Sequence, residues 1–188
     1  MRLFVGIALT EAARAALGRL AGGIRGARWL EPQNLHLTLY FAGEIEPGTA
    51  EDLDAALTMV EAPAFELTLS GIGVFERRGR VHAAWAGVAA ERALTYLKER
   101  IDGALAQAGF EPEHRKFKPH VTLARMKNVP VADVTPWLEI HGAFAAEPYE
   151  VAAFHLYRSH LGRAGAHYEP LVDYPLESLA GAGGDQMD

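Results

Sequence analysis

The chain has 188 residues, of which 49% are hydrophobic and 22% charged, with a formal net charge of -6. This composition is that of a globular protein able to bury a core, in one sizeable domain or two small lobes. The negative charge argues against a protein that coats long nucleic acid by counterion release, although a local pocket could still hold one or two phosphates. The chain contains no cysteine, which removes disulfides, thiolate metal sites and a cysteine nucleophile and favours a cytoplasmic setting.

Hydrophobic periodicity and turn residues divide the chain into short elements. The expected elements, in chain order, are a strand at 2–8, a helix capped by Thr10 and stopped by Gly22-Gly23, a short strand at 27–30, a strand at 35–43, a helix at 47–60, strands at 64–69 and 81–88, a helix at 90–109, a strand at 119–125, a short helix at 131–138 broken near Pro136, and a hairpin of strands at 150–159 and 166–171. This order is neither a strict strand–helix alternation nor an all-β pattern, so it predicts an α+β fold. No apolar run is long enough for a membrane helix, and we expect no membrane association.

Two of the expected strands carry the same motif, His-x-Thr-x with apolar residues at the x positions. The first copy begins at His36 and the second at His120, with threonines at Thr38 and Thr122. Because side chains alternate along a strand, each histidine shares one face with its threonine, and the aliphatic residues lie behind. In an unbroken strand Tyr40 would also join the first His-Thr face. Two such strands side by side would line a cleft with two imidazoles and two hydroxyls.

These side chains suit the cleavage of a phosphodiester. An imidazole with a pKa near about 6.5 can give or take a proton at neutral pH, and a threonine hydroxyl can donate to an anionic oxygen. The reaction needs a base for the nucleophile, an acid for the leaving oxygen and donors for the other oxygens. The two motifs supply all three, so no metal or other cofactor is required. The alternative reading of the pattern is two half-buried strands with chance histidines.

The chain resembles the two-histidine phosphoesterase superfamily, and within it the RNA 2',3'-cyclic phosphodiesterases, also called 2'-5' RNA ligases. The resemblance spans residues 2 to about 176 and rests on both motifs and on the segments around them. These segments are Arg2-Leu3-Phe4-Val5, Arg28-Trp29-Leu30, Asn34 to Leu39, Phe41 to Glu44, Arg80 to Val88, Phe117 to Arg125, Leu156 to Ser159 and Tyr168 to Leu171. It implies a bilobal fold with a pseudo-two-fold pair of antiparallel sheets, outer helices and a central cleft. We expect one domain at 1–178 and a flexible tail at 179–188.

The resemblance also implies an activity, the metal-independent hydrolysis of a terminal RNA 2',3'-cyclic phosphate to a 2'-phosphomonoester, with reversible 2'-5' ligation as its companion. By motif, His36 would protonate the departing 3' oxygen, His120 would activate water, and Thr38 and Thr122 would hold the phosphate. One alternative is a cyclic phosphodiesterase for small nucleotides such as cyclic ADP-ribose phosphate or 2'-5' oligoadenylate. Another is a nucleotide- or RNA-end-binding module with little turnover. We expect a monomer.

Three further side chains are candidates at the site. The resemblance implies that Arg125 contacts the phosphate, yet in an unbroken strand it would face away from His120. A twist or bulge would have to turn it inward; otherwise it is a surface arginine. Tyr40 and Phe117 are candidates for stacking on a base, whereas Trp29 is expected to pack in the core or at the rim.

Two other groups are expected to be structural. His155 and His160 have a spacing seen in zinc sites, but no third ligand accompanies them. The basic segment Arg77–Arg80 could steer RNA toward the cleft, although a solvated loop is the simpler interpretation.

Overall fold

The computed structural model describes residues 1–113, 115–162 and 165–178, so the expected tail at 179–188 lies outside the described residues. In chain order the elements are β1 (Arg2–Ala8), α1 (Glu11–Gly18), β2 (Ala27–Trp29), the 3₁₀ helix η1 (Pro32–Asn34), β3 (His36–Glu44), α2 (Pro47–Thr58), β4 (Phe65–Leu67), β5 (Leu69–Arg77), β6 (Arg80–Val88), α3 (Arg92–Gln107), β7 (His120–Pro130), α4 (Val131–His141), β8 (Tyr149–Val151), β9 (Ala153–Gly162) and β10 (Gly165–Pro175). The predicted α+β class is confirmed.

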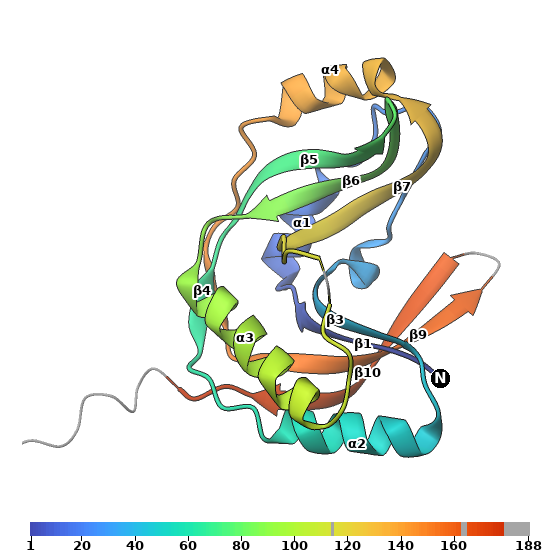
Figure 1. Cartoon of the computed structure of the whole chain (residues 1–188). Helices are drawn as coiled ribbons and strands as arrows, with labels where there is room; N and C mark the ends of the chain where they lie inside the picture. The colour runs from blue at the N-terminus through green and yellow to red at the C-terminus, as the bar shows by residue number, and fades with distance from the viewer. Residues whose placement is uncertain (114, 163–164, 179–188) are drawn as a thin grey trace, which may run out of the picture.

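The large sheet is antiparallel and consists of two halves. Among the described residues its strand order is β10-β9-β1-β3-β7-β6-β5, with β2 paired to β7. The motif strands β3 and β7 are neighbours in the middle, and they pair only at Leu37 and Val121. Figure 1 shows the two halves diverging from this junction. The two predicted sheets are therefore joined at the motifs, and a small separate sheet holds β4 and β8.

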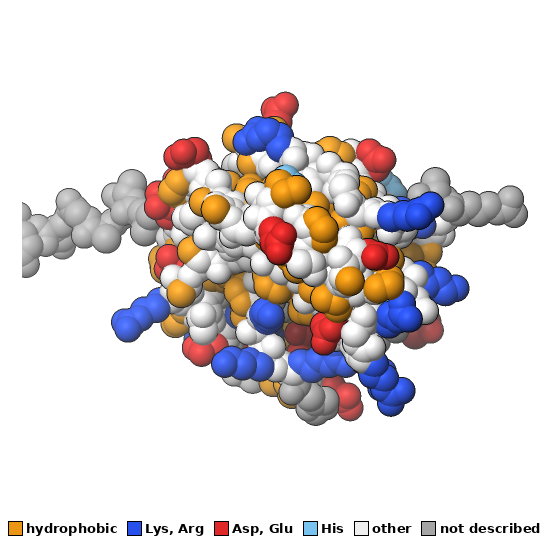
Figure 2. Space-filling model, turned by 90° about the horizontal axis from the view of Figure 1, so that it is seen from above, with side chains coloured by type: hydrophobic (Ala, Val, Ile, Leu, Met, Phe, Trp, Pro, Cys, Tyr) orange, Lys and Arg blue, Asp and Glu red, His pale blue; other side chains and the backbone are white. Residues whose placement is uncertain are grey.

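Helices cover the aliphatic side of each half. α2 and α3 contact each other beside the half that contains β1 and β3, and α4 lies over β5, β6 and β7 (Figure 1). Leu37 and Val121, which stand between histidine and threonine in the two motifs, are completely buried. Because neighbours along a strand face opposite sides, this burial leaves the imidazoles and hydroxyls on the other face. In Figure 2, viewed from the α4 side, hydrophobic side chains lie interspersed with charged ones, and Lys and Arg gather mainly along one margin.

Two elements differ from the sequence-based expectation. The helix expected to break near Pro136 continues to His141. Proline removes one helical hydrogen bond, but Trp137, which follows it, is 2% exposed and its Nε1 donates to Leu20 O at 2.8 Å. This packing holds the helix together. Residues 70–76 were not expected to be a strand, yet they belong to β5; Gly71 and Gly73 weaken the strand pattern there.

Candidate active site

Each motif strand contains a β-bulge immediately after its threonine. In β3, Gly6 pairs with Thr38 but Val5 pairs with Tyr40, which leaves Leu39 without an opposite residue. In β7, Trp85 pairs with Thr122 but Ala84 pairs with Ala124, which leaves Leu123 unmatched. An extra residue in one strand inverts the face taken by every side chain that follows it. The two motifs therefore share a local distortion as well as a sequence.

The bulge in β7 turns Arg125 toward the histidines. Arg125 is exposed, whereas Leu123 and Ala124 are both buried, so the simple alternation is broken at this point. A cavity of about 330 Å³ is lined by Arg125 together with His36 and Thr38. The structure thus contains the distortion that a phosphate-contacting arginine at this position requires.

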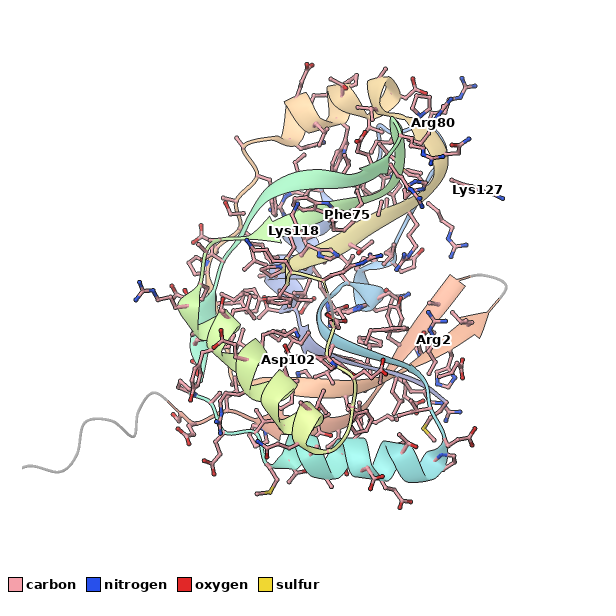
Figure 3. The ribbon with its side chains drawn as sticks, viewed as in Figure 1. Arg2, Phe75, Arg80, Asp102, Lys118 and Lys127 are labelled. Atoms are coloured by element: carbon pink, nitrogen blue, oxygen red, sulfur yellow. The ribbon has the colours of Figure 1, made fainter. Side chains whose placement is uncertain are left out.

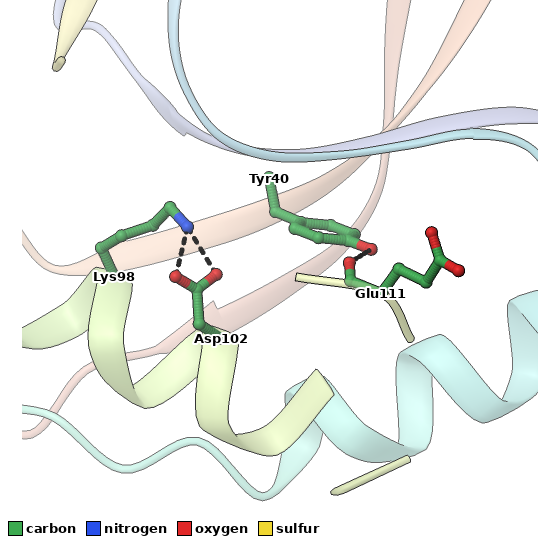
Figure 4. A network of polar contacts seen from close by, with 4 residues as sticks. All are labelled: Tyr40, Lys98, Asp102 and Glu111. Carbon is green, nitrogen blue, oxygen red and sulfur yellow. Dashed lines mark hydrogen bonds and ion pairs between the residues drawn. The ribbon is translucent and has the colours of Figure 1, made fainter. Parts of the chain in front are cut away.

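Tyr40 was expected on the face of His36 and Thr38, and this prediction is wrong because the bulge in β3 turns it to the other face. Tyr40 is 5% exposed, and its hydroxyl donates to the Glu111 backbone oxygen at 3.0 Å on the helical side of the sheet (Figure 4). Burial raises the pKa of Tyr40, and the nearby carboxylates of Glu113 and Asp102 raise it further. Tyr40 is therefore a core residue and not a base contact.

Phe41 takes the place in the cavity that the sequence assigned to Tyr40. It is 44% exposed and lines the cavity that contains His36 and Thr38. The Arg2 guanidinium lies 4.9 Å from the centroid of its ring. Sequence reasoning missed Phe41, although one signal was present, because Phe41 and Arg125 stand at the same distance after their histidines.

Both imidazoles are held by the same contact. His36 Nδ1 lies 2.8 Å from Asn34 O, and His120 Nδ1 lies 2.7 Å from Lys118 O. A carbonyl oxygen can only accept a hydrogen bond, so Nδ1 carries the proton in each neutral ring. Nε2 of each histidine takes no part in this contact and is the ring nitrogen that can exchange a proton with a ligand.

The surroundings lower the pKa of both histidines. Burial lowers the pKa of His36 to about 4; the hydrogen bond to Asn34 opposes this, and the positive charges of Arg125 and His120 add to it. Burial likewise lowers the pKa of His120, and the charges of Lys118 and Arg125 act in the same direction. Without an anion, both rings are mainly neutral at pH 7. A phosphate between them would raise both pKa values, because an opposite charge favours the protonated form.

Comparison with known proteins identifies the family of the chain. The model of the LigT like Phosphoesterase family matches residues 7–85 and 87–168. The chain belongs to this family. An RNA 2',3'-cyclic phosphodiesterase of Geobacillus stearothermophilus is 31% identical over 92% of the chain, which spans 56% of that relative. Another, from Archaeoglobus fulgidus, is 31% identical over 91% of the chain and 98% of the relative.

A solved structure extends the likeness to the fold. E. coli LigT complexed with 3'-AMP is 27% identical, with a TM-score of 0.73 over 93% of this chain and 97% of that one. The resemblance seen in the sequence is confirmed, and with it the class of enzyme, a phosphoesterase.

Aromatic rings surround each histidine of this phosphoesterase. The His36 ring lies 4.6 Å from Phe4 and 4.7 Å from Tyr168, measured between centroids. The His120 ring lies 4.8 Å from Phe75 and 6.3 Å from Trp85. These contacts restrict the orientation of each imidazole beyond the single hydrogen bond at Nδ1.

Two glycines opposite motif residues allow close approaches between strands of the large sheet. Gly6 lies opposite Thr38, and a Cβ there would stand 2.8 Å from Leu37 O. Gly87 lies opposite His120, and a Cβ there would stand 2.7 Å from Ser70 O. Both contacts are with backbone oxygens, which cannot swing aside as a side chain can. A side chain at Gly6 would press on the motif strand β3, and one at Gly87 would push β5 away from β6, the strand that pairs with the motif strand β7.

Phe117 does not line the cavity that contains His36, Thr38 and Arg125. Its ring is half-buried against the core, and the Lys98 ammonium lies 5.5 Å from its centroid. Lys98 is 5% exposed and donates to both carboxylate oxygens of Asp102 (Figure 4). The position supports a role in anchoring the loop before β7 and does not support base stacking. Trp29 packs on Trp137, with 5.8 Å between ring centroids, as expected of a core or rim residue.

In the part of the chain that the structure describes, the two groups expected to be structural, the pair His155 and His160 and the basic segment Arg77–Arg80, do not belong to a metal site or to the cavity that contains His36. His155 Nδ1 pairs with Asp173 and His160 Nε2 pairs with Glu169, each at 2.7 Å, so the two histidines have separate partners. Within the described residues, no group of three or more histidine and acidic side chains could hold a metal. Arg77–Arg80 forms the turn between β5 and β6. The described helices include none that is long and apolar enough to span a membrane.

Proposed function

We propose that the protein hydrolyses the terminal 2',3'-cyclic phosphate of RNA to a 2'-phosphomonoester, with His36 and His120 as the acid–base pair. The observation that carries the proposal is the matched anchoring of two imidazoles through Nδ1 on adjacent strands, beside threonines and one arginine. The names of the relatives support the substrate, and the E. coli LigT structure with 3'-AMP supports a nucleotide site in this fold.

The strand register suits a single phosphorus atom between the histidines. Because Leu37 lies opposite Val121, extending the register by one residue puts Thr122 opposite His36 and Thr38 opposite His120. In a regularly paired sheet such diagonal neighbours lie about 7–8 Å apart at the backbone, and here β3 and β7 diverge from the single pair Leu37–Val121. This separation leaves room for a phosphate with one oxygen beside each Nε2.

The reaction needs one proton at each end. His36 Nε2–H donates its proton to the 3' oxygen as the P–O3' bond breaks. His120 Nε2 accepts a proton from water as the water oxygen bonds to phosphorus, and the P–O2' bond remains. The reaction leaves His36 neutral and His120 charged, and exchange with solvent restores the starting pair.

Hydroxyls and one cation hold the phosphate during this exchange. Thr38 and Thr122 share the face of the histidines and can donate to the non-bridging oxygens. Arg125 adds a positive charge where negative charge accumulates. Since these groups supply charge stabilisation, we propose that the reaction proceeds without a metal. Both halves of the sheet contribute residues, so we propose that residues 1–178 act as one domain and as a monomer.

Phe41 is the base contact in this proposal. Its exposed ring lines the same cavity as His36, where the ribose with the departing 3' oxygen must lie. Arg2 and Arg28 line the same cavity and can approach the phosphates of the RNA strand. A base stacked on Phe41 would therefore have its backbone beside two guanidinium groups.

A second candidate is hydrolysis of small cyclic nucleotides. The observation that favours it is the size of the cavity, about 330 Å³, which is at the lower end for ligand pockets. Turnover of a cyclic-phosphate oligonucleotide compared with the matching mononucleotide separates the two functions. Tight binding with no product over long incubation would instead identify a binding module.

The test is incubation of a 2',3'-cyclic-phosphate oligonucleotide with the protein in the presence of a metal chelator. We expect a 2'-phosphate product, and we expect His36→Ala or His120→Ala to lower the rate about 10²–10⁴-fold. Loss of activity in chelator combined with full activity of both variants would overturn the proposal. A 3'-phosphate product would overturn the assigned roles of the two histidines.

A further inference from the structure

Each histidine has its own pair of aromatic neighbours, contributed by a different half of the sheet. Beside His36 lie Phe4 and Tyr168 from the half that contains β3. Beside His120 lie Phe75 and Trp85 from the other half. Figure 3 shows Phe75 and Lys118 together on the β5–β7 half, with Arg2 on the half that contains β1.

The register places this second aromatic group on the face of the histidines. Trp85 lies opposite Thr122. Phe75 lies opposite Ala83, which in turn lies opposite Arg125. Opposite residues of an antiparallel pair share a face, so both rings point to the same side as the threonine and the arginine.

Phe75, Trp85 and Lys118 form a compact unit, which we name the His120 platform. Phe75 is 36% exposed, and its ring meets the His120 ring at 83°. The Lys118 ammonium lies 4.6 Å from the Trp85 ring centroid and 5.7 Å from that of Phe75. The platform therefore offers the partly exposed aromatic ring of Phe75, with a positive charge beside it and next to the proposed general base.

The geometry of displacement at phosphorus determines which group lies beside each histidine. The attacking and departing oxygens lie roughly in line on opposite sides of the phosphorus. If His36 protonates the 3' oxygen, the ribose and its RNA chain lie on the His36 side, and the nucleophile enters on the His120 side. A water nucleophile needs no aromatic surface, whereas a nucleoside that presents a hydroxyl has a base that stacks on one.

We propose that the His120 platform binds a second RNA end, the nucleoside whose 5'-hydroxyl replaces water in 2'-5' transfer; this rests on the proposed function. His120 accepts the proton of the 5'-hydroxyl as the O5'–P bond forms. The P–O3' bond breaks, and His36 donates its proton to the 3' oxygen. The product is a 2'-5' phosphodiester. The base of the incoming nucleoside stacks on Phe75, and Lys118 approaches the phosphate that follows that nucleoside.

The test measures the ratio of transfer to hydrolysis from one cyclic-phosphate oligonucleotide. A 5'-hydroxyl dinucleotide is added as one acceptor and methanol, which cannot stack, as the other. We expect Phe75→Leu to lower the dinucleotide ratio about 5-fold or more, in line with the loss of one base stack, and to leave the methanol ratio unchanged. Phe75→Tyr should retain the dinucleotide ratio, and Lys118→Gln should lower it.

The ratio isolates the acceptor site because transfer and hydrolysis use the same histidines, so a disturbed His120 lowers both. Phe41→Ala is the matched control in the cavity that contains His36, where we expect both rates to fall together and the ratio to hold. An unchanged dinucleotide ratio in Phe75→Leu, or an equal fall of the methanol ratio, would overturn the inference. Hydrolysis by the unaltered protein with no preference for the dinucleotide would also overturn it. If the cyclic phosphate is not opened at all, the proposed function itself fails.

Discussion

Because the bulge in β3 buries Tyr40 and exposes Phe41, we expect substitutions at these adjacent residues to have opposite effects: the first on stability, the second on activity. Tyr40→Phe removes one hydroxyl that donates to Glu111 O at 3.0 Å from a ring that is 5% exposed. A hydrogen bond of this kind contributes about 0.5–1.5 kcal/mol net. In a chain of this size we expect Tm to fall by about 1–6 °C. The activity should not change, because the hydroxyl lies on the helical side of the sheet.

Phe41→Ala should show the reverse pattern. Phe41 is 44% exposed, so little buried surface is lost and Tm should change little. Loss of a stacked base costs about 1–3 kcal/mol, which corresponds to a fall of about 5- to 150-fold in kcat/KM on a cyclic-phosphate oligonucleotide. Thermal unfolding followed by circular dichroism and initial-rate kinetics on the same preparations measure both quantities.

Two results would refute this reasoning. If Tyr40→Phe lowers kcat/KM as much as Phe41→Ala does, the bulge does not decide which ring faces the substrate. If Phe41→Ala retains kcat/KM within about 2-fold, a range too small for a lost stack, the exposed ring does not contact a base.

Three further predictions concern charge and packing. Arg125→Met removes a positive charge that lowers both histidine pKa values, so the pH profile of kcat/KM should move to higher pH; an unmoved profile would contradict this. Because the pKa of His36 is lowered to about 4, the unfolded state binds a proton first, and stability is lost as pH falls from about 6.5 to 4. His36→Gln should make this loss smaller in denaturant titrations by up to about 3 kcal/mol, and an unchanged pH dependence would count against the shift. Gly87→Ala places a Cβ 2.7 Å from a backbone oxygen and should lower Tm by about 2–12 °C; Gly103→Ala, in a helix with nothing within 4 Å, should not lower Tm.

Local sequence was sufficient for most of the elements and for the class of protein, while the strand at residues 70–76 and the full length of α4 were missed. Thr10 was predicted to cap a helix, and its hydroxyl accepts from Ala13 N at 3.2 Å at the start of α1. The two His-x-Thr motifs were predicted to be strands with aliphatic backs, and Leu37 and Val121 are completely buried. Such features depend on residues near one another in the chain, which is why hydrophobic periodicity and capping chemistry reveal them. The family resemblance also came from these contiguous segments.

Only the tertiary structure decided which side chains lie beside the motif residues in the cavity. Strand alternation predicts a face correctly until an extra residue enters, and the unmatched residues Leu39 and Leu123 are defined by pairing with β1 and β6. These two bulges place Arg125 and Phe41 in the cavity and turn Tyr40 away from it. A bulge is a property of two strands and not of one, because it arises from a mismatch in their hydrogen-bond register. The sequence by itself therefore identified the histidines and threonines, and the pairing of distant strands selected their neighbours.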